Sequence, residues 1–127
     1  MKSQINSKLF FINDDGSHIP EHQLLSFNIL FPKLCEGGVY IIEDIETSYW
    51  TKGGISGYKT NYGYKNPNSI IEIFKSVIDN INSEFAGERA SIINHLDKIG
   101  SITFAKNCII IVKKTQIKRP YGFAENL

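Results

Sequence analysis

Two short apolar runs, each followed at once by acidic residues, stand out in the first part of the chain. Residues 9–12 read Leu-Phe-Phe-Ile and precede Asn-Asp-Asp-Gly, and residues 39–42 read Val-Tyr-Ile-Ile and precede Glu-Asp. A continuous apolar run that ends in a polar turn is typical of a strand buried on both faces of a parallel sheet. The pattern therefore predicts two such strands.

The stretch between these two strands has helical spacing. Pro20 stands where a helix can begin, and apolar residues then recur every three or four positions. Because Pro32 disfavours a continuing helix, we expect the helix to end near Phe31. Gly37 and Gly38 should separate the helix from the second strand. Strand, helix and strand form a βαβ unit, whose parallel strands end at the same edge of the sheet.

Beyond the second strand the pattern changes three times. Residues 45–67 are rich in Gly, Tyr, Lys and Thr without periodicity, and loops of this length are usually lids or disordered segments. Residues 70–85 predict an amphipathic helix. Its apolar face consists of Ile70, Ile71, Phe74, Val77, Ile78, Ile81 and Phe85. The β-rich runs 99–104 and 108–112 predict an antiparallel hairpin, and residues 113–127 predict a flexible basic tail.

Length and composition indicate an ordinary globular chain. It has 127 residues, of which 42% are hydrophobic and 21% charged, so we expect a single domain over residues 1–127 with one core. The net charge of +1 provides no overall field that favours nucleic acid or an acidic membrane surface. Cys35 and Cys108 lack the spacing of a redox or zinc motif, and no apolar run approaches the roughly 20 residues of a membrane span. A cytoplasmic location is the resulting expectation.

The acidic strand ends raise the question of a cation site. Asp14 and Asp15 follow the first strand, while Glu43 and Asp44 follow the second, and ligands of open α/β sheets bind beyond such carboxyl ends. Converging carboxylates repel one another unless they are protonated or neutralised, and hard oxygen ligands favour Mg²⁺, Mn²⁺ or Ca²⁺. The alternative is that these residues are turn formers and solvated loop acids, and spacing alone does not separate the two interpretations.

Three segments resemble a known family of enzymes. They are DDGSH at 14–18, LFPKLCEGGVYIIED at 30–44 and TSYW at 47–50. In this order and spacing they resemble the C-terminal part of class I methyltransferases of the macrolide-sugar type, the mycinamicin and macrocin O-methyltransferases. The later helix and strand pair, at 70–85 and 99–112, also match. The resemblance implies an α/β fold with a partial Rossmann-like sheet: a βαβ unit, a long loop, a helix and a C-terminal antiparallel strand pair.

The resemblance also implies roles for four residues. Asp15, Glu43 and Asp44 match the family's ligands for Mg²⁺, with Mn²⁺ as the alternative ion, and His18 matches its proposed general base. The family uses S-adenosylmethionine, so the implied reaction is metal-assisted methyl transfer to a hydroxyl group of a small molecule such as a sugar. Such a hydroxyl is a poor nucleophile, and both a metal ion and a base would activate it.

Two aromatic residues, Tyr49 and Trp50, begin the long loop. They could cover the metal and stack on the acceptor substrate, or they could simply pack the loop onto the core. The sequence supports both interpretations equally.

The chain departs from the family in two respects. A class I methyltransferase begins with a strand and a glycine-rich turn that hold the cofactor, followed by an acidic strand end for its ribose, and neither is found in these residues. Residues 9–12 should then form an edge strand, and S-adenosylmethionine should require a second polypeptide or self-association to complete the sheet. Asn13 also replaces an aliphatic residue of the family. Two alternatives to an enzyme of this type remain, a non-catalytic remnant that serves as an interaction module and a metal-dependent hydrolase.

Overall fold

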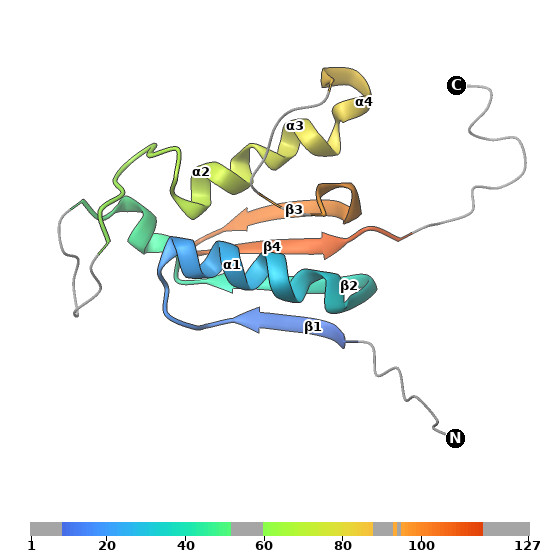
Figure 1. Cartoon of the computed structure of the whole chain (residues 1–127), viewed down its shortest axis with the longest axis horizontal. Coiled ribbons are helices and arrows are strands. Elements are labelled where there is room, and N and C mark those ends of the chain that lie inside the picture. Colours follow the sequence, from blue (N-terminus) through green and yellow to red (C-terminus); the bar gives the residue numbers. More distant parts are fainter. Residues whose placement is uncertain (1–8, 52–59, 88–92, 94, 116–127) are drawn as a thin grey trace, which may run out of the picture.

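The chain folds around a four-stranded mixed sheet in the order β1-β2-β4-β3 (Figure 1). This computed structural model describes residues 9–51, 60–87, 93 and 95–115. β1 (Leu9–Asp14) runs parallel to β2 (Leu34–Glu43), and β4 (Cys108–Lys113) lies antiparallel between β2 and β3 (Ile99–Ala105). The predicted α/β fold with a βαβ unit and a C-terminal strand pair is confirmed.

The connection from β1 to β2 follows the predicted pattern with one difference. α1 (Pro20–Leu30) has proline in its first turn, and a 3₁₀ turn, η1 (Phe31–Lys33), follows it. β2 starts at Leu34, so Gly37 and Gly38 lie within this strand and do not precede it. Gly37 has a φ of +77°, and a Cβ on Gly38 would lie 2.9 Å from the carbonyl oxygen of Cys35. The glycines therefore allow an irregular start that apolar periodicity did not reveal.

The predicted helix over 70–85 is wrong in its continuity. The segment forms three short helices, α2 (Ile70–Lys75), α3 (Val77–Ile81) and α4 (Ser83–Ala86). Ser76 and Asn82 occupy the breaks, and their side chains donate to backbone carbonyls three or four residues earlier, at 2.6 and 2.9 Å. Such local bonds compete with helical hydrogen bonding. As a result Phe85, expected on the buried face, is 83% exposed.

The remaining connections are short where the structure describes them. The loop after β2 opens with a 3₁₀ turn, η2 (Ile45–Tyr49), and residues 52–59 of the predicted lid lie outside the described residues. A further 3₁₀ turn, η3 (Leu96–Lys98), precedes β3, and the predicted hairpin joins β3 to β4. The tail was expected from Lys113, but Lys113 is the last residue of β4, and residues 116–127 lie outside the described part.

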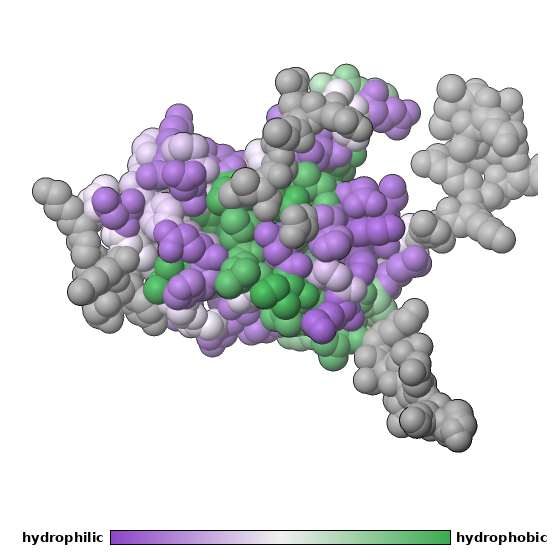
Figure 2. Space-filling view, viewed as in Figure 1, coloured by the Kyte–Doolittle hydropathy of each residue, from purple (hydrophilic) through white to green (hydrophobic). Residues whose placement is uncertain are grey.

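One hydrophobic cluster joins the helices to one face of the sheet. Phe27 of α1 stacks on Phe31, with ring centroids 4.6 Å apart, and meets the edges of Tyr40 and Phe74 at 5.1 and 5.0 Å. Ile42, Ile109 and Ile111 of the sheet belong to the same cluster. Figure 2 shows the surface over these helices, where hydrophobic side chains gather in the middle of a largely hydrophilic face. No helix among the described residues has the length and apolar character to cross a membrane.

β1 lies at the edge of the sheet, as the resemblance implied. The expectation that it is buried on both faces is wrong, because Phe10 is 71% and Phe11 57% exposed. An apolar run does not by itself distinguish a central strand from an edge strand.

Candidate metal centre

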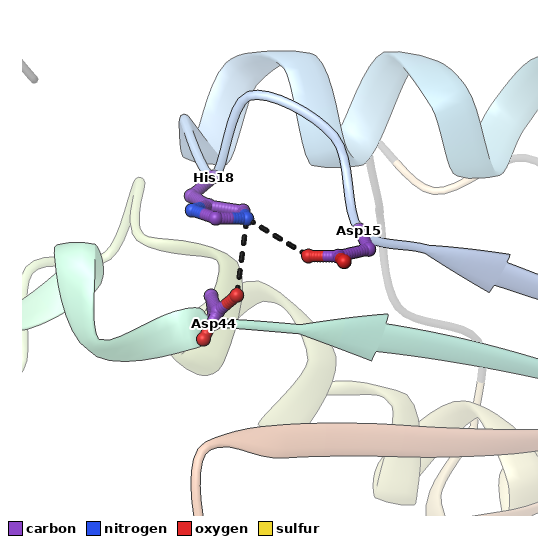
Figure 3. A group of neighbouring side chains, drawn as sticks. All are labelled: Asp15, His18 and Asp44. Atoms are coloured by element: carbon purple, nitrogen blue, oxygen red, sulfur yellow. Dashed lines mark hydrogen bonds and ion pairs between the residues drawn. The ribbon is translucent and has the colours of Figure 1, made fainter.

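The ends of β1 and β2 bring three side chains together (Figure 3). β1 and β2 are adjacent and parallel, so the residues that follow them meet at one edge of the sheet. Nε2 of His18 lies 3.1 Å from Oδ1 of Asp15 and 3.0 Å from Oδ2 of Asp44. One ligand atom from each residue lies within 4.8 Å of the others. Sequence reasoning predicted all three residues for this site.

Two of the three residues have an unusual backbone conformation. His18 and Asp44 are left-handed, with φ of 60° and 55°. For residues other than glycine this conformation costs about 1–3 kcal/mol, and it persists only where surrounding contacts hold it. The hydroxyl of Thr47 donates to the carbonyl oxygen of His18 at 2.5 Å. The buried amide of Gln23 donates to the carbonyl of Glu43 at 3.0 Å and lies 3.4 Å from that of Asp44.

Asn107, in the turn between β3 and β4, forms a clamp on Asp44. Its Nδ2 donates to Oδ1 of Asp44 at 3.1 Å, and its carbonyl oxygen accepts from the Asp44 backbone amide at 3.0 Å. Its Oδ1 accepts from the backbone amide of Glu46 at 2.9 Å. The left-handed φ of 58° at Asn107 suits asparagine, which tolerates this region better than most residues. Asp44 is thereby oriented through both its backbone and its carboxylate.

Asp15 is held much more loosely than Asp44. Its side chain is 61% exposed, against 35% for Asp44, and it contacts Nε2 of His18. The preceding acid, Asp14, is not part of the group. Its Oδ1 accepts from the backbone amide of Gly16 at 3.1 Å, and partial burial raises the pKa of its carboxyl group.

Glu43, the third predicted metal ligand, makes a different contact. Its Oε2 accepts from Nδ2 of Asn13 at 3.0 Å, and its carboxylate is not among the three convergent ligand atoms. Asn13 is the residue that departs from the family's aliphatic pattern. The departure thus coincides with a hydrogen bond that draws the Glu43 carboxylate toward β1.

The two predicted substrate-binding residues, Tyr49 and Trp50, lie at the end of η2 and directly after it. Tyr49 is exposed at the end of the 3₁₀ turn, and Trp50 is half-buried. A later part of the same loop bonds to this segment: the Tyr62 amide donates to the Trp50 carbonyl at 2.8 Å, and the Gly63 amide donates to the Ser48 carbonyl at 3.1 Å. Their proximity to a substrate stays a prediction.

The surroundings of His18 determine which protons it can carry. Nε2 faces two carboxylate oxygens, which only accept hydrogen bonds, so we assign a proton to Nε2 in this arrangement. His22, the nearest other histidine in sequence, instead bonds through Nδ1 to the Ser17 hydroxyl at 2.7 Å. His18 is therefore the imidazole that belongs to the acidic group.

The donor set fits a hard divalent cation. Mg²⁺ prefers oxygen ligands, keeps several waters and is commonly bound through one or two carboxylates. Asp15 and Asp44 offer two such oxygens from adjacent strand ends. The same oxygens could hold Mn²⁺, which shares this preference.

Gln23 and Asn107 are the residues that sequence reasoning missed. Gln23 lies within the predicted helix, and nothing in the sequence links it to the end of β2. Asn107 lies in a predicted turn, where its residue type indicates a left-handed conformation. Its contact with Asp44 spans 63 positions in sequence, so only the strand order β2-β4 reveals it.

Comparisons with known proteins identify methyltransferases as relatives of the chain. No protein-family model matches the chain. It is 45% identical over 74 residues to L-olivosyl-oleandolide 3-O-methyltransferase of Streptomyces antibioticus, which covers 58% of this chain and 18% of that protein. It is 60% identical over 37 residues to demethylmacrocin O-methyltransferase of Streptomyces fradiae, covering 29% of this chain and 9% of that protein.

A solved structure extends the match to most of the fold. MycE methyltransferase of the mycinamycin biosynthetic pathway, in complex with Mg, SAH and mycinamycin VI, superposes with a TM-score of 0.65 at 30% identity. The match covers 85% of this chain and 26% of that chain. The matches thus span about a quarter of the length of the solved relative and less than a fifth of the length of each of these two curated relatives. Its homologues are macrolide-sugar O-methyltransferases, and it matches one part of such a protein.

Proposed function

We propose that this chain supplies the metal-binding and proton-accepting part of a metal-assisted, S-adenosylmethionine-dependent O-methyltransferase. The observation that carries the proposal is the convergence of Asp15, His18 and Asp44 at adjacent strand ends. The methyltransferase names of the relatives support the reaction class. The acceptor would be a hydroxyl group of a small molecule, with a sugar as the candidate that the relatives suggest.

Asp15 and Asp44 would hold Mg²⁺ or Mn²⁺, and Glu43 would be the third protein ligand. Glu43 needs to release the Asn13 amide to join them, because that amide now takes its Oε2. When bound, the cation would neutralise the clustered carboxylates and increase the acidity of a coordinated hydroxyl group. Clustered acids at a sheet edge without a counterion would otherwise repel one another.

His18 would accept the proton of the acceptor hydroxyl. The oxygen of that group attacks the sulfonium methyl carbon, a carbon–oxygen bond forms, and the carbon–sulfur electron pair stays on sulfur. The proton released from the oxygen passes to the imidazole. Because Nε2 is protonated while it faces both carboxylates, His18 can take up a proton there only after it has given up that one. Tyr49 and Trp50 would border the acceptor through their rings.

The cofactor is expected to bind this chain weakly on its own. The glycine-rich turn and the acidic strand end that hold S-adenosylmethionine in class I methyltransferases are not found in these residues. Few contacts would then offset the entropy lost on binding. Calorimetric titration with the cofactor, with and without Mg²⁺, tests this expectation, and low-micromolar binding by the monomer would contradict it.

The proposed function is tested in two steps. Manganese titration followed by electron paramagnetic resonance should detect one site in the wild type and lose it in Asp15→Asn and Asp44→Asn. Methyl transfer from labelled cofactor, measured with the chain joined to the cofactor-binding part of a relative, should be lost in His18→Ala and kept in His22→Ala. Metal binding without methyl transfer in the joined protein would favour the interaction module, and no metal binding would refute the centre.

A further inference from the structure

A recess lies between α1 and the segment that leads into α2. Its volume is about 490 Å³, which is within the range of small-molecule sites in proteins. Both helices begin at the end of the molecule where β1 and β2 end (Figure 1). Because the first turn of α1 and residues between 61 and 68 line the recess, it lies at the same end of the molecule as the candidate metal centre.

The deeper part of the lining is apolar. Pro20 and Ile73 are buried, and Ile19 and Leu24 are half-buried. Ile73 belongs to the hydrophobic core and Leu24 packs against it, so both side chains are held in place. This part of the recess offers a surface on which the C–H groups of a ligand can pack, and such packing is favourable because apolar area leaves water.

The outer part of the lining is polar. Asn61 and Asn68 are exposed, and the amide of each can both donate and accept hydrogen bonds. The hydroxyl of Tyr62 donates to Oε1 of Glu21 at 2.8 Å and so joins the loop to the first turn of α1. Asn66 instead bonds within the loop, where its Nδ2 donates to the Tyr62 carbonyl at 3.2 Å and its Oδ1 accepts from the Asn68 backbone amide at 2.9 Å. The side chains of Asn61, Asn68 and Glu21 are therefore the polar groups that a ligand would meet.

Charge narrows the class of ligand. Among the described residues that line the recess, Glu21 is the only one charged at neutral pH. Burial and the hydrogen bond to Glu21 raise the pKa of Tyr62 to about 12, so its hydroxyl stays a donor. An anionic ligand would face the Glu21 carboxylate with no lysine or arginine of this lining to offset the repulsion. A neutral ring with hydroxyl groups on one side and apolar groups on the other matches the lining, and a deoxy sugar is such a ring.

We propose that this recess binds a neutral deoxy-sugar ring of the acceptor, other than the ring that is methylated. The assignment to the acceptor rests on the function proposed above. Both walls of the recess adjoin the candidate metal centre, since Ile19 directly follows His18 and the Gly63 amide donates to the carbonyl of Ser48 in η2 at 3.1 Å. None of the three residues of the metal group lines the recess, so the ring held there is not the one whose hydroxyl reacts.

Binding is tested with methyl α-L-rhamnopyranoside, a neutral deoxy-sugar glycoside, added to the full chain with EDTA present. EDTA removes divalent cations, so the candidate metal centre takes no part. We expect saturable shifts of the Asn61 and Asn68 side-chain amide signals in nitrogen-15 NMR spectra, with a Kd of about 1–10 mM for so small a ligand. D-glucuronate, an anion of similar size, should bind about tenfold more weakly or less well still.

Two pairs of variants locate the contact. Leu24→Trp fills the recess and should weaken rhamnoside binding by about tenfold or more, whereas Leu25→Trp, exposed on the same helix and outside the lining, should not. Asn68→Ala removes one amide and should weaken binding by about 3- to 10-fold, whereas Lys65→Ala, exposed in the same segment and outside the lining, should not. Circular dichroism verifies each fold, and Asn68→Ala decides if Leu24→Trp does not fold. No saturable shifts, or equal effects within either pair, would overturn the proposal.

A paramagnetic ion tests whether the recess serves the acceptor. With Mn²⁺ in place of EDTA, the signals of the bound rhamnoside should broaden in the wild type, and this broadening should disappear in Asp44→Asn while rhamnoside binding persists. Bound Mn²⁺ that leaves the rhamnoside signals sharp would overturn the assignment to the acceptor. A chain that binds the rhamnoside but no Mn²⁺ would refute the proposed function and leave the sugar site standing, so the two failures are distinguishable.

Discussion

The two carboxylates of the candidate metal centre are held very differently. Asp44 is fixed through its backbone amide and its Oδ1 by Asn107, and its carbonyl lies beside Gln23. Asp15 is largely exposed and contacts His18. The comparison indicates a site built from one preorganised ligand and one adaptable ligand. We therefore expect the affinity for a metal ion to depend mainly on Asp44, which follows β2. Preorganisation lowers the cost of binding because fewer groups need to be ordered.

The strongest test of this asymmetry replaces each acid in turn. Asp44→Asn should lower Mn²⁺ affinity by more than about 100-fold, since ligand loss should exceed the roughly 10–100-fold effect of losing an outer-shell partner. Asp15→Asn should lower Mn²⁺ affinity less, because water can replace a ligand on an exposed side chain. Electron paramagnetic resonance titration measures both. A larger loss for Asp15→Asn would reverse the comparison.

Removing the clamp should have the next largest effect. Asn107→Gly allows the left-handed backbone but removes both side-chain hydrogen bonds, and we expect about a 10-fold loss of Mn²⁺ affinity. Lys106→Ala, in the same turn, is the control and should leave affinity unchanged. If Asn107→Gly binds Mn²⁺ as tightly as the wild type, the backbone of this turn is sufficient to orient Asp44.

Loss of Gln23 should act on stability as well as on the site. Gln23→Leu removes the hydrogen bond to the Glu43 carbonyl and should lower the free energy of unfolding by about 1 kcal/mol. Urea denaturation measures the change, with His22→Ala at an exposed position of the same helix as the control. An unchanged free energy of unfolding would mean that the Glu43 carbonyl, without Gln23, accepts a hydrogen bond from water or from another group.

The smallest predicted effect is a gain. Asn13→Val removes the amide that draws Glu43 away, so Mn²⁺ affinity should rise by a few-fold, worth about 0.5–1 kcal/mol. The double variant Asn13→Val with Glu43→Gln should lose this gain, because the freed ligand is then neutral. A gain that persists in the double variant would exclude Glu43 as its cause.

Much of the fold was predictable because local patterns determined it. The apolar runs ending in acids marked β1 and β2, and their parallel pairing followed from the helix between them. The apolar run did not reveal the exposure of β1, whereas the family resemblance placed this strand at the edge of the sheet. The breaks at Ser76 and Asn82 were not predictable, since they depend on side chains that bond to their own backbone. At the site, the parallel strand ends indicated where acids would meet, and the family resemblance singled out Asp15, His18 and Asp44. Asn107 was not predicted, because its contact with Asp44 depends on β4 lying next to β2.

The hydrogen bond from Asn107 to Asp44 also determines the order in which parts of the candidate metal centre can form. β4 lies next to β2, yet Asn107, directly before β4, is synthesised 63 positions after Asp44. Chains are synthesised at about 5–20 residues per second, so several seconds pass between the synthesis of Asp44 and that of the turn that orients it. During that interval the nascent chain can already pair β1 with β2 and fold α1 over them. The candidate metal centre is therefore completed only after the hairpin of β3 and β4 has docked beside β2.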